Sequence, residues 1–434
     1  MSSSFPPECW QSTTLGSVIE LVYGKSLPAK VRDGVSFPVF GSNGVVGKHS
    51  IPLVENPGLI VGRKGSFGEV HISEEPFFPI DTTYYVDNFH GQPIRYWFYQ
   101  LRFLPLNQLN RATAIPGLNR KDAYSQEIAL PPLAEQKAIA DKLDTLLAQV
   151  ENTKARLERI PQILKRFRQS VLAAAVSGQL TEEWRSGDNP EQIFKKLGEA
   201  GIEVKTGPFG SALHKSDYVN GGIPVINPMH ISDGTIKPSD AMTISHQKYT
   251  SLEAWHLRKG DVVVGRRGEM GRASVVESDE SQLCGTGSMI LRVGEDALPK
   301  YLEIILRSPT AVSYFNSASV GSTMVNLNQK VIKNLEVYFP SLSEQTEIVR
   351  RVDQLFAHAD RIEQQVNNAL ARVNNLTQSI LAKAFRGELT EQWRKDNPEL
   401  ISGENSAEAL LERIKAERAA AKPAKKTRSK RATV

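Results

Sequence analysis

One 55-residue segment occurs twice in this chain, and the repeat limits what the rest can fold into. The copies run from Pro131 to Arg185 and from Pro340 to Arg394, align at an offset of 209 positions without a gap, and share 19 identical residues among their 55 positions. Each copy has Glu-Gln near its start and Trp-Arg at its end. A gapless match of this length indicates a duplication.

Each copy carries a heptad pattern of apolar residues. An apolar residue every 3.5 positions over more than four heptads predicts a coiled-coil helix, because it keeps one narrow face towards a partner helix. A helix from about residue 134 to residue 176 would be roughly 64 Å long at 1.5 Å per residue. The two seams can pair with each other, although an ordinary helical bundle would show a similar stripe. The seam positions are Ile139, Leu143, Leu146, Val150, Leu157, Ile160, Leu164, Phe167 and Val171 in the first copy, and Ile348, Val352, Leu355, Ala359, Ile362, Val366, Ala369, Val373, Leu376 and Ile380 in the second.

Proline and glycine set limits to these helices. Pro161 stands in the first copy where Leu370 stands in the second. Because proline has no backbone N–H, we expect a kink or a break near Ile160. Gly178 and Gly387 follow the two patterns, as a left-handed C-terminal cap requires.

The composition excludes several classes of protein. A chain of 434 residues with 40% hydrophobic and 23% charged residues has room for two to four domains. Its two cysteines, Cys9 and Cys284, are too few for a disulfide framework or a metal cluster, and its eight histidines are scattered. No apolar run of about 18 residues and no signal peptide is present, so we expect a cytoplasmic protein.

The formal net charge of +5 is concentrated at the C-terminal end. Lys and Arg against Asp and Glu number 11 to 11 in residues 1–130 and 16 to 17 in residues 186–338, but 10 to 6 in residues 395–434. The basic pI is therefore poor support for nucleic-acid binding by the folded part. We expect a helix from Ser406 and a disordered basic tail behind it.

Globular and helical segments alternate along the chain. The two globular segments carry short apolar runs bounded by glycine, proline and charged residues, which are typical of strands, and then one proline-opened amphipathic helix each, from Pro93 and from Pro299. Shared landmarks indicate that they are diverged copies of each other. We therefore predict an α+β fold made by tandem duplication, with β-rich domains at 1–130 and 186–338, long helices at 131–185 and 339–394, and a C-terminal helix and tail at 395–434.

Two basic clusters recur in both globular segments. The first is VGRKGSFG from Val61 and VGRRGEMG from Val264; it lacks the Gly-Lys-Ser/Thr of a P-loop and predicts a tight turn between strands. The second follows Leu118 and Leu327. Basic and amide side chains on rigid turns suit phosphate oxygens and base edges, whereas a solvated hairpin tip and a structural turn would explain them equally simply. The candidate DNA-binding residues are Arg63, Lys64, Asn119, Arg120, Lys121, Arg266, Arg267, Asn328, Gln329 and Lys330.

Catalytic and metal-binding motifs are absent from the sequence. Asn227-Pro228-Met229-His230 resembles the Asn-Pro-Pro-aromatic loop of adenine methyltransferases, but it lacks the second proline and the aromatic residue. The repeated carboxylates, such as Glu135 and Glu344, are interpreted as helix caps and partner contacts and not as an acid/base pair. We predict no catalytic residue and no metal ligand.

The whole arrangement resembles the specificity subunit of type I restriction-modification enzymes. Two variable β-rich domains alternate with two similar heptad helices, each entered through LPPLAEQ or FPSLSEQ and left through SGQLTEEWR or RGELTEQWR. The resemblance implies that each β-rich domain is a target-recognition domain that reads one half of an interrupted, asymmetric DNA sequence. It also implies that the helices pack antiparallel and set the spacer between the half-sites.

The same resemblance implies partners. Two methylation subunits would dock on the helical regions and restriction subunits would complete the complex, so that S-adenosylmethionine, ATP and Mg would bind to partners and not to this chain. This chain would then be a non-catalytic subunit of a DNA methyltransferase and deoxyribonuclease. The candidate partner-binding residues are Glu135, Gln136, Trp184, Arg185, Glu344, Gln345, Trp393 and Arg394.

Three alternatives stay open at the level of sequence. The serious one is a stand-alone, sequence-specific DNA-binding or architectural protein that uses the coiled coil only internally and needs no partner. A self-sufficient restriction or modification enzyme would require motifs that the sequence lacks. A scaffold without any role on nucleic acid is the third.

Overall fold

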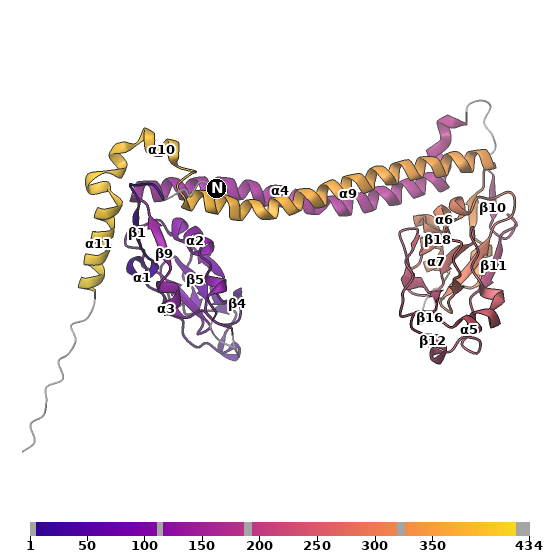
Figure 1. The fold of residues 1–434 in the computed structure, drawn as a ribbon, viewed down its shortest axis with the longest axis horizontal. Coiled ribbons are helices and arrows are strands. Elements are labelled where there is room, and N and C mark those ends of the chain that lie inside the picture. The colour runs from indigo at the N-terminus through magenta and orange to yellow at the C-terminus, as the bar shows by residue number, and fades with distance from the viewer. Residues whose placement is uncertain (1–5, 111–115, 186–192, 319–325, 422–434) are drawn as a thin grey trace, which may run out of the picture. The chain divides into compact units, whose positions relative to one another are not determined.

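The computed structural model describes residues 6–110, 116–185, 193–318 and 326–421. The chain forms two compact units (Figure 1). Unit 1 comprises residues 1–157 and 369–434, and unit 2 comprises residues 158–368. Two 44-residue helices, α4 (Leu133–Val176) and α9 (Leu342–Phe385), contribute to both units.

Domain 1, the globular part of unit 1, is built on a four-stranded antiparallel sheet of order β2-β8-β5-β6. Helix α2 packs on this sheet through Tyr96, Trp97 and Leu101, which are buried. A smaller sheet has the order β4-β3-β7, and its strands alternate along the chain with those of the main sheet. Strand β1 pairs with β9, the strand that leads into α4. The elements are β1 (Gln11–Thr14), α1 (Leu15–Val18), β2 (Val22–Tyr23), β3 (Phe37–Gly41), β4 (Gly44–His49), β5 (Gly58–Gly62), β6 (Val70–Ser73), β7 (Phe78–Pro79), β8 (Thr83–Val86), α2 (Ile94–Phe103), α3 (Arg120–Tyr124) and β9 (Glu127–Leu130).

Domain 2, the globular part of unit 2, repeats the topology of the main sheet, while its second sheet has four strands in the order β12-β16-β13-β19. Its main sheet has the order β11-β20-β17-β18, and these strands correspond to β2, β8, β5 and β6 of domain 1. Strand β10 pairs with β21 just before α9. The α+β fold and the tandem duplication are thus confirmed. The elements are β10 (Phe194–Lys196), β11 (Glu203–Thr206), β12 (Tyr218–Val219), β13 (Ile223–Ile226), β14 (Ile231–Ser232), β15 (Thr235–Ile236), β16 (Thr243–Ile244), α5 (His246–Ser251), β17 (Val262–Gly265), β18 (Ala273–Val275), β19 (Leu283–Cys284), β20 (Ser288–Arg292), α6 (Pro299–Arg307), α7 (Pro309–Ser317), α8 (Gln329–Lys333) and β21 (Glu336–Tyr338).

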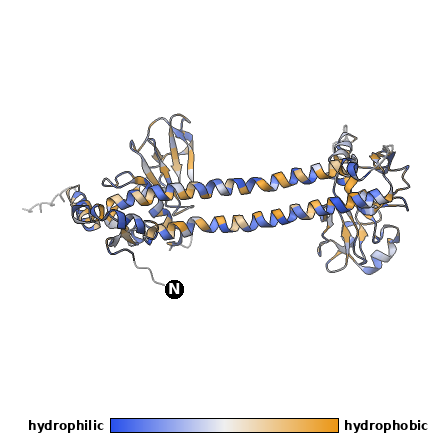
Figure 2. Cartoon of the chain, turned by 90° about the horizontal axis from the view of Figure 1, so that it is seen from above, coloured by the Kyte–Doolittle hydropathy of each residue, from blue (hydrophilic) through white to orange (hydrophobic). Residues whose placement is uncertain are grey.

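Helices α4 and α9 pack antiparallel. In unit 1 the first half of α4, through Leu143, shares a core with the end of α9, through Phe385; in unit 2 the end of α4, through Val171, shares a core with the start of α9, through Ile348. Apolar residues alternate with polar ones along both helices (Figure 2). One seam position departs from the prediction, because Leu376 is 44% exposed.

Pro161 does not end the first helix. Helix α4 runs through it without interruption, so a break near Ile160 is wrong, while the kink stays a prediction. Pro161 is exposed and the next seam residue, Leu164, is buried, so packing one turn later holds the helix despite the lost hydrogen bond. The predicted caps are confirmed, because Gly178 and Gly387 have φ of 76° and 80°.

The C-terminal region adds helix α10 (Glu391–Asp396) and helix α11 (Ala407–Ala420) to unit 1. Ser406 caps α11 by accepting a hydrogen bond from the Ala409 N–H, as the predicted helix start requires. Leu410, Leu411 and Ile414 join the core of domain 1. The basic tail lies outside the described residues. Among the described helices, none is long and apolar enough to cross a membrane.

Candidate nucleic-acid interface

The two glycine-rich motifs form the same turn in both domains. The first connects β5 to β6 and the second connects β17 to β18, each within an antiparallel pair. Gly65 and Gly68 have φ of 75° and 78°, and Gly268 and Gly271 have φ of 78° and 83°. A Cβ on Gly68 would also lie 2.4 Å from the Asn107 nitrogen. The predicted strand-to-strand turn is confirmed, and only glycine fits its positive-φ positions without strain.

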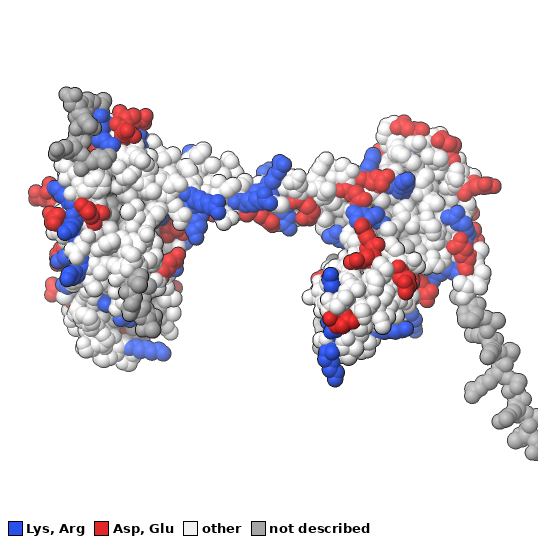
Figure 3. All heavy atoms as spheres, turned by 180° about the vertical axis from the view of Figure 1, so that it is seen from behind, with Lys and Arg blue, Asp and Glu red and all other residues white. Residues whose placement is uncertain are grey.

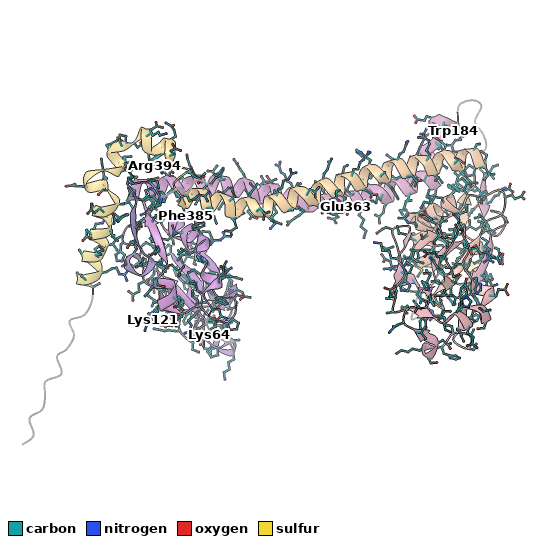
Figure 4. The ribbon with its side chains drawn as sticks, in the orientation of Figure 1. Lys64, Lys121, Trp184, Glu363, Phe385 and Arg394 are labelled. Atoms are coloured by element: carbon teal, nitrogen blue, oxygen red, sulfur yellow. The ribbon has the colours of Figure 1, made fainter. Side chains whose placement is uncertain are left out.

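The structure brings the two basic clusters of each domain together. In domain 1 the Leu118 N–H donates to the Arg63 carbonyl at 2.9 Å, and in domain 2 the Leu327 N–H donates to the Arg266 carbonyl at 2.8 Å. Lys64 and Lys121 lie at the same end of domain 1 (Figure 4). We call the two sets the basic edges: Arg63, Lys64, Asn119, Arg120 and Lys121 in domain 1, and Arg266, Arg267, Asn328, Gln329 and Lys330 in domain 2.

The basic edge of domain 1 is organised around an aromatic ring. The guanidinium carbons of Arg63 and Arg120 lie 5.2 and 4.9 Å from the ring centroid of Tyr23, which is 44% exposed. Burial, followed by the hydrogen-bonding interaction with Tyr23, raises the pKa of the neighbouring Tyr84 to about 12, so this phenol stays neutral. Cation–π attraction to this ring favours these positions for both arginines. Sequence reasoning missed Tyr23, because nothing in its local sequence places it beside two distant arginines.

The basic edge of domain 2 has a different chemistry at the matching position. Gln329, which corresponds to Arg120 at the offset of 209, donates from Nε2 to Thr206 Oγ1 at 3.3 Å. Arg266 donates from Nε to Asn326 Oδ1 at 3.0 Å. Partial burial, and then the charge of Arg267, lower the pKa of Arg266 from its ordinary value, although an arginine remains protonated in proteins.

Two predicted edge residues have a structural role. Asn119 Oδ1 accepts from the Lys121 N–H at 2.9 Å and caps α3, and Asn328 Oδ1 accepts from the Val331 N–H at 3.0 Å and caps α8. Asparagine is among the preferred N-cap residues. The cap therefore accounts for asparagine at both positions without a ligand.

Charge is mixed over the globular parts. On the face shown in Figure 3, acidic and basic side chains are interspersed on both domains. This pattern agrees with the near-zero balance of charge in each domain sequence. The basic edges are accordingly local features and not part of a broad positive field.

The repeated Glu-Gln and Trp-Arg motifs form two buried contacts, which we call latches. In unit 1, Glu135 Oε1 accepts from Thr390 Oγ1 and Arg394 Nη1, both at 2.6 Å, while Glu135 Oε2 accepts from Trp10 Nε1 at 2.8 Å. In unit 2, Glu344 Oε1 accepts from Thr181 Oγ1 at 2.6 Å, from Arg185 Nη1 at 2.8 Å and from the Tyr338 hydroxyl at 3.0 Å. Each latch joins the start of one repeat to the end of the other.

The glutamine beside each latch ties the helix to its own domain. Gln345 Nε2 donates to the Asp296 carbonyl at 2.9 Å, and its Oε1 accepts from the Leu298 N–H at 2.9 Å, just before α6. Gln136 Nε2 donates to Gln92 Oε1 at 3.1 Å, just before α2. The Glu-Gln pair therefore connects three elements in each unit.

These contacts change the interpretation of the predicted partner-binding residues. Glu135, Gln136 and Gln345 are fully buried and Glu344 is 5% exposed, so they offer no surface to another chain. Arg185 and Arg394 are committed to the latches. Partner contact stays a prediction for Trp184, which is 40% exposed, and for the half-buried Trp393.

The fold and the basic edges define a tandem-repeat protein with two related but unequal basic surfaces. Residues 7–162 and 196–372 match the family model of the type I restriction modification DNA specificity domain, and the chain belongs to this family. It is 43% identical over 390 residues to the EcoBI specificity subunit of Escherichia coli, across 86% of this chain and 82% of that protein. It is 38% identical over 450 residues to the EcoDI specificity subunit of Escherichia coli, across 99% and 100% of the two chains.

Two solved structures have a similar fold. The HsdS subunit from Thermoanaerobacter tengcongensis matches with a TM-score of 0.57 and 19% identity over 88% of this chain and 98% of that one. A chain from a structure of type I R-M complex assembly matches with a TM-score of 0.64 and 18% identity over 88% and 99%. The family resemblance inferred from the sequence is confirmed.

Removing one cation from a latch should destabilise the protein. In Arg185→Met the Glu344 carboxylate stays buried with one charged donor fewer, so we expect the free energy of unfolding to fall by about 3 kcal/mol. Arg394→Met should have a similar effect through Glu135. Guanidinium unfolding followed by circular dichroism measures the change.

An exposed ion pair gives the control for this prediction. Lys415→Met removes the pair with Glu412, in which both side chains are more than half exposed, and should change stability by less than about 0.5 kcal/mol. If Arg185→Met is no more harmful than Lys415→Met, the latches do not stabilise the fold.

Proposed function

We propose that this chain is the DNA specificity subunit of a type I restriction-modification complex, in which each domain reads one half of an interrupted target. One observation carries the proposal: two domains whose main sheets share one topology bring the same pair of distant clusters together at the same place. The relatives support it, since they are specificity subunits of type I restriction enzymes by name.

The two basic edges suit different bases. Arginine can donate two parallel hydrogen bonds to guanine, whereas glutamine pairs with the edge of adenine. Arg120 in domain 1 and Gln329 in domain 2 occupy matching positions, and Tyr23 orients Arg120. Because these matching positions carry different side chains, the two domains should recognise different half-sites, which favours an asymmetric target over a palindrome.

The helices would set the distance between the half-sites, and partners would supply the chemistry. Two methylation subunits would bring S-adenosylmethionine, and restriction subunits would bring ATP and Mg, so that this chain itself would catalyse nothing. Phosphate contacts normally dominate affinity for DNA, and the charge of each domain is balanced. The methylation subunits would therefore also provide many of the contacts to the DNA phosphates. Trp184 and Trp393 are the remaining candidates for their docking.

The lysines of the domain 1 edge should contribute salt-dependent affinity. Replacing Lys64 and Lys121 by alanine in the assembled complex should weaken binding to target and non-target DNA alike, and should reduce the slope of log K against log salt by about 2. Fluorescence anisotropy at several salt concentrations measures this slope. The double control Lys395→Ala and Lys415→Ala, on α10 and α11, should leave the slope unchanged. Equal slopes for the wild type, the edge variant and the control variant would show that the lysines of this edge do not contact DNA.

Lengthening both helices should lengthen the recognised spacer. Seven residues inserted near Thr153 and near Ile362 keep the heptad phase and add about 10 Å to each helix, equivalent to about three base pairs. Both half-sites should stay the same, because neither basic edge changes. A methylation map of cells carrying the insertion reports the spacer, and an unchanged spacer would refute the helices as its determinant.

The first test of the function is genome-wide adenine methylation in cells that hold this chain and its methylation subunit. We expect an interrupted two-part motif that disappears when this chain alone is deleted. If methylation is unaffected by the deletion, the specificity role is wrong. Tight, selective binding of the purified chain to random duplexes would then identify the stand-alone DNA-binding protein.

A further inference from the structure

Unit 2 contains a cavity of about 320 Å³ where domain 2 meets helix α9. Helix α6 and strand β18 form part of its wall beneath α9 (Figure 1). The apolar part of the lining includes Ile304, Val352 and Phe356. The cavity belongs neither to the basic edge nor to the latch of this unit, so nothing described so far gives it a function.

The polar groups of this cavity favour a cation. Its ionisable lining residues are four acidic ones and two basic ones, which leaves a balance of 2 − 4 = −2. The basic pair is already engaged, because Arg307 and Lys300 hold the fully buried Glu303 at 2.9 and 3.1 Å. The charged lining residues are Asp233, Glu277, Lys300, Glu303, Arg307 and Asp353.

Two acceptors in the lining are unsatisfied. Gln282 is 6% exposed, and its buried Oε1 has no hydrogen-bond partner among the described residues. Asp353, on α9, is exposed at the mouth of the cavity and has no hydrogen bond or ion pair within the described part of the chain. The buried Gln282 acceptor without a donor costs free energy, so a ligand that donates a hydrogen bond to it would be stabilised, and the exposed Asp353 carboxylate would supply the opposite charge for a cationic ligand.

The duplication shows what kind of donor fits such a carboxylate. In unit 1 the residue equivalent to Asp353 is Asp144, at the offset of 209. Asp144 is bound by Arg95 of α2, with Nη2 at 2.5 Å and Nε at 3.1 Å, and by the Tyr99 hydroxyl. Unit 1 therefore supplies its own guanidinium from the domain helix, whereas in unit 2 the cations of α6 are bound to Glu303.

We propose that the cavity of unit 2 binds an alkyl guanidinium group. The guanidinium pairs with Asp353 and donates to Gln282 Oε1, because a planar fork of five N–H donors can serve both acceptors. Its alkyl stem packs against Val352 and Phe356. The group is either an arginine side chain of a protein partner or a small free guanidine compound.

Agmatine, a four-carbon chain with a guanidinium at one end and an ammonium at the other, tests the site without any partner. Calorimetric titration of the full chain should show saturable binding, weakened about tenfold by Asp353→Asn and by Gln282→Met, since each removes one hydrogen bond to a charged group. Glu280→Gln, which removes an exposed carboxylate outside the cavity, should bind agmatine like the wild type. Thermal melts check that all variants fold.

A second experiment distinguishes a partner's arginine from a small guanidine compound, and it rests on the proposed function. The affinity of the methylation subunit for the chain is compared between the wild type and Asp353→Asn. A loss of about tenfold assigns the site to a partner arginine; an unchanged affinity together with agmatine binding assigns it to a small guanidine compound. If agmatine does not bind and subunit affinity is unchanged, the proposal is wrong, and the methylation pattern of the wild type remains a separate test of the specificity role.

Discussion

The reciprocal hydrogen-bonded ion pair between the start of each long helix and the segment that follows the other long helix is the contact on which this architecture depends. Glu135 and Glu344 are withdrawn from solvent, and a buried carboxylate is tolerated only with a full set of donors. Sliding α4 against α9 by one heptad would keep the apolar seam matched but would leave both carboxylates without Arg394 and Arg185. The latches therefore fix a register that the heptad pattern alone leaves degenerate.

The same motif transmits that register to the globular domains. Gln345 is bonded to the loop before α6, and Gln136 to the loop before α2. Adjacent side chains on one helical turn thus bind both the segment that follows the other long helix and the domain of their own unit. Within each unit, the basic edge therefore belongs to a domain that is attached to its helix by buried hydrogen bonds. Such a rigid attachment is needed to position the basic edge on DNA.

Local periodicity explains what the sequence could predict. The strands, the two proline-opened helices, the heptad helices and the glycine turns all follow from residues close together in the chain, and they are found where expected. The adjacency of Lys64 to the segment at Leu118, the stacking of Arg120 on Tyr23, and the pairing of Glu135 with Arg394 join residues that are 54, 97 and 259 positions apart. No local pattern encodes such contacts, so the sequence predicts helix caps and partner contacts for residues that the structure buries in the latches. The break expected at Pro161 is absent for the opposite reason, because packing at Leu164 outweighs a local helix-breaking signal.

The two halves of the chain share the contacts of the latches but differ in the side chains of the basic edges. Both latches keep glutamate, threonine and arginine, although their third donor differs, Trp10 in one and Tyr338 in the other. The basic edges keep their backbone pairing and capping asparagines but exchange Arg120 for Gln329. Interactions that hold the halves together are thus preserved in chemistry, whereas side chains that project from the same scaffold are free to diverge. A reader of two different half-sites needs this division, since its geometry must be symmetric while its base contacts must not be.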